Sequence, residues 1–147
     1  MPEFHVFSLE QGRLDEAYPL VRAAARVTPE QWERYALRLL AEGGGILMVR
    51  AGDDCLHGLA AYRELGSLRH GSSLQVEVVI ALELGPPGPV RQALCRALEE
   101  VALSRGCKSL SYTLAARSNA DPKSPGRASW EELGLQMDTI GFVRDLP

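Results

Sequence analysis

The strongest constraint in this sequence is the break between Leu74–Glu83 and the segment that begins near Pro89. The first segment alternates like a strand, whereas the second carries apolar residues at helical spacing. Between them lies Gly85-Pro86-Pro87-Gly88-Pro89, and such a run of glycines and prolines ends a strand abruptly. The chain must therefore pass from a strand into the N-terminus of a helix within a few residues.

The helix after this break is the strongest helical signal in the chain. Its apolar stripe consists of Val90, Ala93, Leu94, Ala97, Leu98, Val101 and Ala102. The first turn of a helix has backbone N–H groups without intrahelical partners, and the macrodipole adds partial positive charge. A pyrophosphate suits such a position. The alternative is a plain turn, because many strand-to-helix turns contain glycine and bind nothing.

Strands and helices alternate before this junction. A strand is predicted over Phe4–Leu9, then a helix over Leu14–Arg26 that Pro19 kinks or delays. A second helix begins after Thr28, because Thr28-Pro29-Glu30-Gln31 combines an N-cap, a proline in the first turn and a polar third residue. Three strands follow at Ile46–Arg50, Cys55–Glu64 and Leu74–Glu83, with a loop over Gly66–Ser73 before the last of them.

The third of these strands is expected to present two different faces. One face is predicted to carry Val76, Val78, Ile80 and Leu82. The other face is predicted to carry Gln75, Glu77, Val79, Ala81 and Glu83. The second face is part apolar and part charged, so we expect it to line a cleft.

After the long helix we predict a strand over Cys107–Leu114, a loop over Ala115–Gly126, a short helix over Arg127–Leu133 and a last strand over Gln136–Val143. The order is strand, helix, helix, three strands, helix, strand, helix, strand. It predicts an α/β fold, a mixed sheet with helices on both faces. We find no internal repeat and no long linker, so residues 1–147 are expected to form one domain.

Composition excludes several classes of protein. The formal net charge of −3 disfavours a nucleic-acid partner, which a basic face would mark. The cysteines Cys55, Cys95 and Cys107 form no C-x-x-C pair and the three histidines are isolated, so no metal site is predicted. No apolar run approaches the about 20 residues of a membrane span, and no secretory signal starts the sequence. We therefore expect a cytoplasmic protein without a membrane partner.

Three segments resemble the GCN5-related N-acetyltransferase family, and the resemblance covers nearly the whole chain. They are Thr28-Pro29-Glu30-Gln31-Trp32, the helix-to-strand segment Ala97–Cys107, and Ala128–Leu135, which matches the family's ending A-x-x-Y-E-x-L-G-F. The resemblance implies a mostly antiparallel sheet and transfer of an acetyl group from acetyl-CoA to an amine. It also implies that a homodimer is one expected assembly.

The resemblance further implies where acetyl-CoA lies. The strand of Leu74–Glu83 and the strand after the long helix are expected to separate, with the pantetheine arm against Val79, Ile80 and Ala81. The pyrophosphate is expected at Gly88, Pro89, Val90 and Arg91, and Asn119 is a candidate for holding the pantetheine arm.

The loop departs from the family's signature Q/R-x-x-G-x-G/A. Ungapped alignment places Pro86 at its first position, Pro89 at the middle glycine and Arg91 at the last; a shift by one residue places Gly88 at the middle glycine. Proline has no N–H to donate, so at least one phosphate donor is missing. Arg91 either compensates as a charged donor or is a solvated helix residue.

The resemblance suggests Glu77 as the general base, directly or through water; the alternative is an exposed residue on a half-solvated strand. Glu83 lies nearer the phosphate end and is a poorer base. Where the family has a catalytic tyrosine this chain has Trp130, whose indole cannot exchange a proton usefully near neutral pH. Tyr112 is the candidate replacement acid, with packing as its alternative role.

Two hypotheses follow. The first is an acyl-CoA-dependent N-acetyltransferase in which a primary amine, of a small molecule or a peptide, attacks acetyl-CoA directly. The second is a catalytically inactive binding or regulatory module with the same fold, which the proline-rich loop and Trp130 favour. No substrate-side motif identifies the acceptor.

Overall fold

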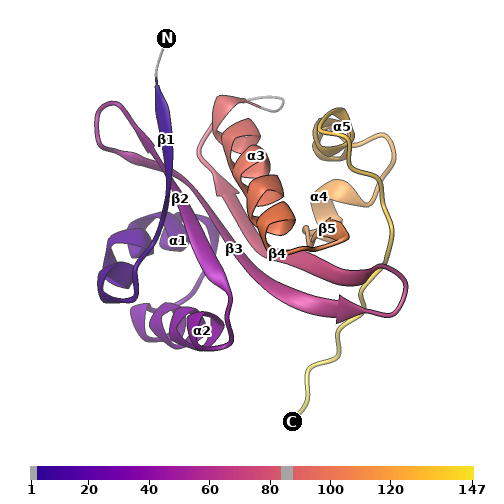
Figure 1. The fold of residues 1–147 in the computed structure, drawn as a ribbon, viewed down its shortest axis with the longest axis horizontal. Coiled ribbons are helices and arrows are strands. Elements are labelled where there is room, and N and C mark those ends of the chain that lie inside the picture. Colours follow the sequence, from indigo (N-terminus) through magenta and orange to yellow (C-terminus); the bar gives the residue numbers. More distant parts are fainter. Residues whose placement is uncertain (1–2, 84–87) are drawn as a thin grey trace.

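The computed structural model describes residues 3–83 and 88–147 of the 147-residue chain. Within this described part, five strands form one sheet in the order β1-β2-β3-β4-β5 (Figure 1). Neighbouring strands are antiparallel except β4 and β5, which are parallel. The strands are β1 (Phe4–Ser8), β2 (Gly45–Ala51), β3 (Leu56–Ser67), β4 (Gly71–Ala81) and β5 (Ser109–Tyr112). The predicted mixed, mostly antiparallel sheet is confirmed.

Helices cover both faces of the sheet, as predicted (Figure 1). The 3-10 helix η1 and helices α1 and α2 pack on one face, α3 packs on the other, and α5 lies beside α3. The helices are η1 (Gln11–Ala17), α1 (Tyr18–Ala24), α2 (Pro29–Ala41), α3 (Pro89–Ser104), α4 (Ala116–Asn119) and α5 (Pro125–Glu132). The predicted loop over Ala115–Gly126 thus contains one short helical turn.

Local sequence signals explain where the first helices begin. Thr28 and Gln31 form a capping box, in which the Gln31 N–H donates to Thr28 Oγ1 at 3.1 Å and the Thr28 N–H donates to Gln31 Oε1 at 2.7 Å. Pro19 lies in the first turn of α1, where its missing N–H costs no hydrogen bond. The helix therefore starts late, one of the two outcomes predicted from Pro19.

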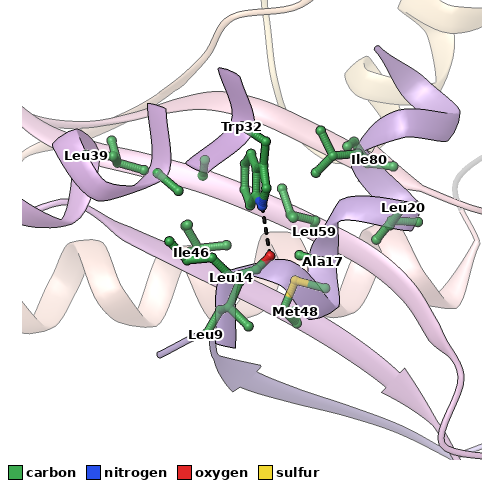
Figure 2. Packing of buried hydrophobic residues seen from close by; sticks show 13 residues of the cluster. Leu9, Leu14, Ala17, Leu20, Trp32, Leu39, Ile46, Met48, Leu59 and Ile80 are labelled. Atoms are coloured by element: carbon green, nitrogen blue, oxygen red, sulfur yellow. Dashed lines mark hydrogen bonds between the residues drawn. The ribbon is translucent and has the colours of Figure 1, made fainter. Parts of the chain in front are cut away.

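Buried apolar side chains form two clusters, one on each face of the sheet. The α2-side cluster comprises Leu9, Leu14, Ala17, Leu20, Val21, Trp32, Ala36, Leu39, Ile46, Met48, Leu59, Ala61 and Ile80 (Figure 2). The α3-side cluster comprises Leu47, Val49, Ala60, Tyr62, Leu74, Val76, Val90, Leu94, Leu98 and Ala102. In the α2-side cluster the Trp32 indole N–H donates to the Leu14 carbonyl at 2.8 Å, so α2 is tied to η1 without an unsatisfied indole.

A β-bulge at Glu77 interrupts β4. Val78 pairs with Ala61 and Val76 pairs with Tyr62, so Glu77 has no partner residue on β3. The extra residue reverses the alternation of side chains beyond it. The prediction that Val76 and Val78 share a face is therefore wrong, because Val76 lies in the α3-side cluster and Val78 packs against the α2-side cluster.

β3 and β4 form one long hairpin, so the predicted loop over Gly66–Ser73 is wrong. Gly66 pairs with Ser72 and Ser67 pairs with Gly71, which leaves a turn of only residues 68–70. Gly71 has a φ of +72°, in the left-handed region that glycine adopts at little cost. The polar side chains that resembled a loop lie at the solvent-exposed end of the hairpin.

The predicted last strand over Gln136–Val143 is also wrong, because this segment has no regular structure. Asp138 pairs with Arg69 at 3.0 Å and with His70 at 3.2 Å, so the segment follows the tip of the β3–β4 hairpin and not the edge of β5. Its apolar side chains bury little surface, since Phe142 is 95% exposed. Apolar alternation forms a strand only where one face of that strand is buried.

The close packing of α3 on β3 predicts the effect of an added methyl group. A Cβ on Gly58 would lie 2.7 Å from Val90 Cγ1 and 3.2 Å from Leu94 Cδ1. Gly58→Ala is expected to lower the free energy of unfolding by about 1–3 kcal/mol, because overpacking a core forces its neighbours apart. Urea denaturation measures this change.

Gly66→Ala in the same strand is the matched control, because no atom lies within 4 Å of a Cβ at that position. Its free energy of unfolding should stay within about 0.5 kcal/mol of the original protein. Equal losses in the two variants would contradict this packing of α3 against β3.

Candidate active site

The parallel pair β4–β5 opens into a gap after four residues. The strands pair from Ser73 with Ser109 to Val76 with Tyr112, and the Thr113 N–H donates to the Val76 carbonyl at 2.9 Å. Beyond Val76, within the described part of the chain, β4 continues to Ala81 paired with β3 alone. The β4–β5 pairing therefore ends next to the bulge, where β5 ends and where the resemblance predicted that the strands separate.

Two of the three predicted β4 residues face this gap with their backbone. The Leu82 N–H donates to the His57 carbonyl at 2.8 Å, which directs Leu82 toward β3. Alternate residues of a strand direct their backbone groups to opposite edges, so Val79 and Ala81 point into the gap. Ile80 does not, because its backbone points toward β3 and its side chain belongs to the α2-side cluster.

The N-terminus of α3 lies at the end of this gap and holds the carboxylate of Glu83. The backbone N–H groups of Gly88, Val90 and Arg91 donate to it at 3.1, 3.0 and 3.2 Å. Pro89 has no N–H to contribute. The sequence predicted these amides as phosphate donors but missed the internal anion. An acidic residue shortly before a helix start is the signal that points to it.

Pro86, which was aligned with the first position of the family's loop, lies outside the described residues.

Arg91 spans from α3 to α5. Its guanidinium carbon lies 4.9 Å from the centre of the Trp130 ring, a cation–π geometry. The residue is half-buried, and its Nε is buried without a hydrogen-bond partner among the described residues. Arg91 is therefore held across the site by packing and is not a solvated helix residue.

Tyr112 stands where β4 and β5 separate. Its ring lies 5.4 Å from that of Trp130, and the Cys95 thiol lies near its hydroxyl. Burial, followed by the nearby Cys95, raises the pKa of the phenol well above its ordinary value, so Tyr112 stays protonated near neutral pH. Tyr112 and Cys95 line a groove of about 510 Å³ between α3, β5 and residues 132–135.

Asn119 makes local contacts at the end of α4. Its side-chain amide donates to the Ala115 carbonyl at 2.8 Å and to Ser118 Oγ at 3.1 Å. These bonds stabilise the turn itself, so contact between Asn119 and a pantetheine arm stays a prediction.

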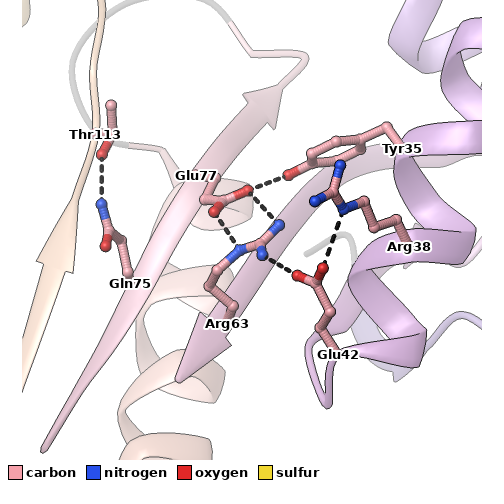
Figure 3. Close-up of polar contacts among 7 residues, drawn as sticks. All are labelled: Tyr35, Arg38, Glu42, Arg63, Gln75, Glu77 and Thr113. Atoms are coloured by element: carbon pink, nitrogen blue, oxygen red, sulfur yellow. Dashed lines mark hydrogen bonds and ion pairs between the residues drawn. The ribbon is translucent and has the colours of Figure 1, made fainter. Parts of the chain in front are cut away.

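Glu77 lies on the α2 side of the sheet, within a network of charged and polar groups (Figure 3). The Tyr35 hydroxyl donates to Glu77 Oε2 at 2.6 Å, and Arg63 forms an ion pair with the same carboxylate. Arg63 also pairs with Glu42, which in turn pairs with Arg38 at 3.0 Å. The expectation that Glu77 shares a face with Val79 and Ala81 is wrong, because the bulge turns its side chain toward α2.

The Glu77 carboxylate is partly accessible to solvent, although Tyr35 and Arg63 both contact it. Its side chain is 25% exposed, so it is not the exposed strand residue of the alternative interpretation. Arg63 was missed, because an arginine in a strand carries no signal of its partner on the next strand.

The raised pKa of Tyr35 predicts a loss of stability at alkaline pH. Burial first, then the hydrogen bond to Glu77, raise the pKa of this phenol above its ordinary value of 10.0. Its contribution to the free energy of unfolding is fully present below pH 10 and is lost as pH rises through the folded-state pKa. Tyr35→Phe should therefore be less stable than the original protein at pH 8, by a margin that shrinks above pH 10. Urea unfolding from pH 8 to 11 measures this, and a constant margin would contradict the assignment.

No family model matches the sequence, and no curated protein matches it. Solved structures do match, at low identity and over nearly the full length. An acetyltransferase from Trypanosoma brucei is 17% identical at a TM-score of 0.74, with 98% of this chain and 100% of that chain covered. A ribosomal-protein-alanine N-acetyltransferase from Brucella melitensis is 20% identical at 0.73, with 99% and 100% covered. An aminoglycoside N-acetyltransferase in complex with CoA is 12% identical at 0.79, with 99% and 96% covered.

None of the described helices is long and apolar enough to cross a membrane. The mostly antiparallel five-stranded sheet flanked by helices, as seen in the described residues, matches the fold of those solved structures. This chain has the fold of the GCN5-related N-acetyltransferases.

Proposed function

We propose that this protein is an acyl-CoA-dependent N-acetyltransferase that moves an acetyl group from acetyl-CoA to a primary amine. One observation carries the proposal: the gap between β4 and β5 opens beside the N-terminus of α3. The backbone of β4 that points away from β3 then lies next to the first amides of α3. An amide-containing arm requires the former and a diphosphate requires the latter.

The groups at this position fit such a donor. The outward backbone groups of Val79 and Ala81 pair with the arm, and the N–H groups of Gly88, Val90 and Arg91 hold the diphosphate. These three amides already bind an anion in the form of Glu83. Arg91 adds a positive charge and an Nε that has no partner in the described part of the chain.

The acceptor amine approaches from the α2 side and the donor from the α3 side. The amine nitrogen attacks the thioester carbon, the N–C bond forms, and the C–S bond breaks. Glu77, through water, takes the proton that the amine loses. Tyr112 donates a hydrogen bond to the departing sulfur, which its position where the strands separate and its retained proton support.

Binding of acetyl-CoA is the first test. At about 100 times its dissociation constant, acetyl-CoA should add roughly 2.7 kcal/mol to the free energy of unfolding. Thermal denaturation with and without acetyl-CoA measures this as a rise in melting temperature.

Arg91→Gln should weaken the binding of acetyl-CoA about ten-fold, since it removes a charged donor.

Arg22→Gln, on an exposed position of α1 away from the β4–β5 opening, is the matched control and should bind as the original protein does. The absence of any shift with acetyl-, propionyl- or longer acyl-CoA would overturn the proposed donor.

Glu77→Gln tests the proposed base. Glutamine keeps an oxygen that accepts from Tyr35 but takes no proton, so kcat should fall about 100-fold with an acceptor that the original protein acetylates. Release of free CoA measures the rate. Glu64→Gln, an exposed position on β3, is the control. An unchanged kcat, with an unchanged acidic limb of the pH–rate profile, would limit Glu77 to holding Arg63 and Tyr35.

A binding or regulatory module with this fold is the second candidate. The observation that favours it is Glu83, whose carboxylate occupies the amides that a diphosphate needs. Acetyl-CoA binding with release of CoA in the presence of an amine supports the enzyme. Binding that yields no product with small amines, peptides or protein N-termini supports the module.

A further inference from the structure

The carboxylate of Glu83 uses every available amide of the first turn of α3. Glu83 Oε1 accepts from the Gly88 and Arg91 N–H groups, and Glu83 Oε2 accepts from that of Val90. Pro89 has no N–H, and the next amide, that of Gln92, bonds to the Gly88 carbonyl at 3.1 Å within the helix. Among the described residues, no free backbone donor is left at this helix terminus.

The carboxylate also fills the space at the turn. A Cβ on Gly88 would clash with Glu83 Oε2 and would lie 2.7 Å from Glu83 Cδ. The Glu83 carboxylate therefore occupies the space that a side chain at position 88 would need. A phosphate that used the same amides would occupy the same volume. Two anions at hydrogen-bonding distance from one set of amides repel each other strongly in a partly buried site.

We propose that Glu83 is an internal competitor for the diphosphate of the acyl donor. This inference rests on the proposed function and adds a specificity determinant to it. A donor with a diphosphate must displace the Glu83 carboxylate from α3 before it binds. A thioester with the same pantetheine arm and no phosphate binds with Glu83 in place. Glu83 therefore lowers the affinity for acetyl-CoA relative to S-acetylpantetheine.

A helix cap and a competitor predict different results when Glu83 is replaced. As a cap alone, Glu83 stabilises α3 through its charge at the positive end of the dipole, and its loss lowers stability without improving binding. As a competitor, Glu83 also stabilises α3, but it occupies the phosphate site. Its loss then lowers the melting temperature of the free protein and tightens the binding of acetyl-CoA. The opposite signs of these two changes are the signature of the proposal.

Two variants separate charge from shape. Glu83→Gln removes the charge and keeps an acceptor oxygen, whereas Glu83→Ala removes both. Glu100→Gln makes the same change of charge on an exposed position of α3, three turns from its N-terminus, and serves as the control. Calorimetric titration at fixed ionic strength measures binding of acetyl-CoA, S-acetylpantetheine and inorganic pyrophosphate to each protein.

The expected result is a gain in affinity for acetyl-CoA of about ten-fold in Glu83→Gln, and at least as large in Glu83→Ala. Pyrophosphate should follow the same order, S-acetylpantetheine should bind all four proteins equally, and Glu100→Gln should behave as the original protein does. Equal binding of acetyl-CoA to the original protein and to both Glu83 variants would overturn the competitor and leave the proposed function standing.

The remaining outcomes distinguish the two proposals. If no protein binds acetyl-CoA but the Glu83 variants gain pyrophosphate binding, the competitor is supported and the proposed donor is wrong. If no protein binds any of the three compounds, both are overturned.

Discussion

The single extra residue at Glu77 in β4 determines how the two faces of the sheet are used. A bulge bends the strand that contains it and increases its twist, and here β4 leaves β5 at this position. The same residue reverses the alternation of side chains, so that Glu77 points toward α2 while Val79 and Ala81 keep their backbone toward the gap. One local irregularity thereby produces the opening and places a carboxylate on one side of it and the α3 N-terminus on the other.

Charge at both ends of this opening is satisfied within the chain. Glu77 is paired with Arg63, and the α3 amides are paired with Glu83. Each contact stabilises the folded protein without a ligand, since a buried or half-buried ionic group without a partner is costly. Each ligand that carries a charge into this site therefore exchanges one charged contact for another, and its net affinity is the difference between them. The geometry of such a site therefore predicts which charged ligand it prefers better than it predicts the affinity for any one ligand.

The sequence predicted the elements whose signals are local. Thr28 begins α2, Pro19 delays α1, and the proline-rich segment separates β4 from α3, each by a rule that needs only a few residues. Prediction from the sequence failed where the structure depends on residues that are distant along the chain. A bulge leaves no mark in the sequence of β4, because Glu77 continues the alternation. The segment Gln136–Val143 has the apolar residues of a strand, but the contacts of Asp138 lead it along the hairpin. Arg63 was missed for the same reason, since its partner Glu77 lies on the next strand.

Two departures from the family's loop, Pro89 and Arg91, act in opposite directions on anion binding. A carboxylate has two oxygens, and the three amides of Gly88, Val90 and Arg91 saturate both of them. A diphosphate offers more oxygens and gains more from a fourth donor, so the proline at position 89 costs a phosphate more than it costs a carboxylate. Pro89 therefore shifts the competition toward the internal anion, and Arg91 is the one side chain on this turn whose charge opposes that shift. The balance between Glu83 and Arg91, both within reach of the same helix terminus, sets which anion the site retains.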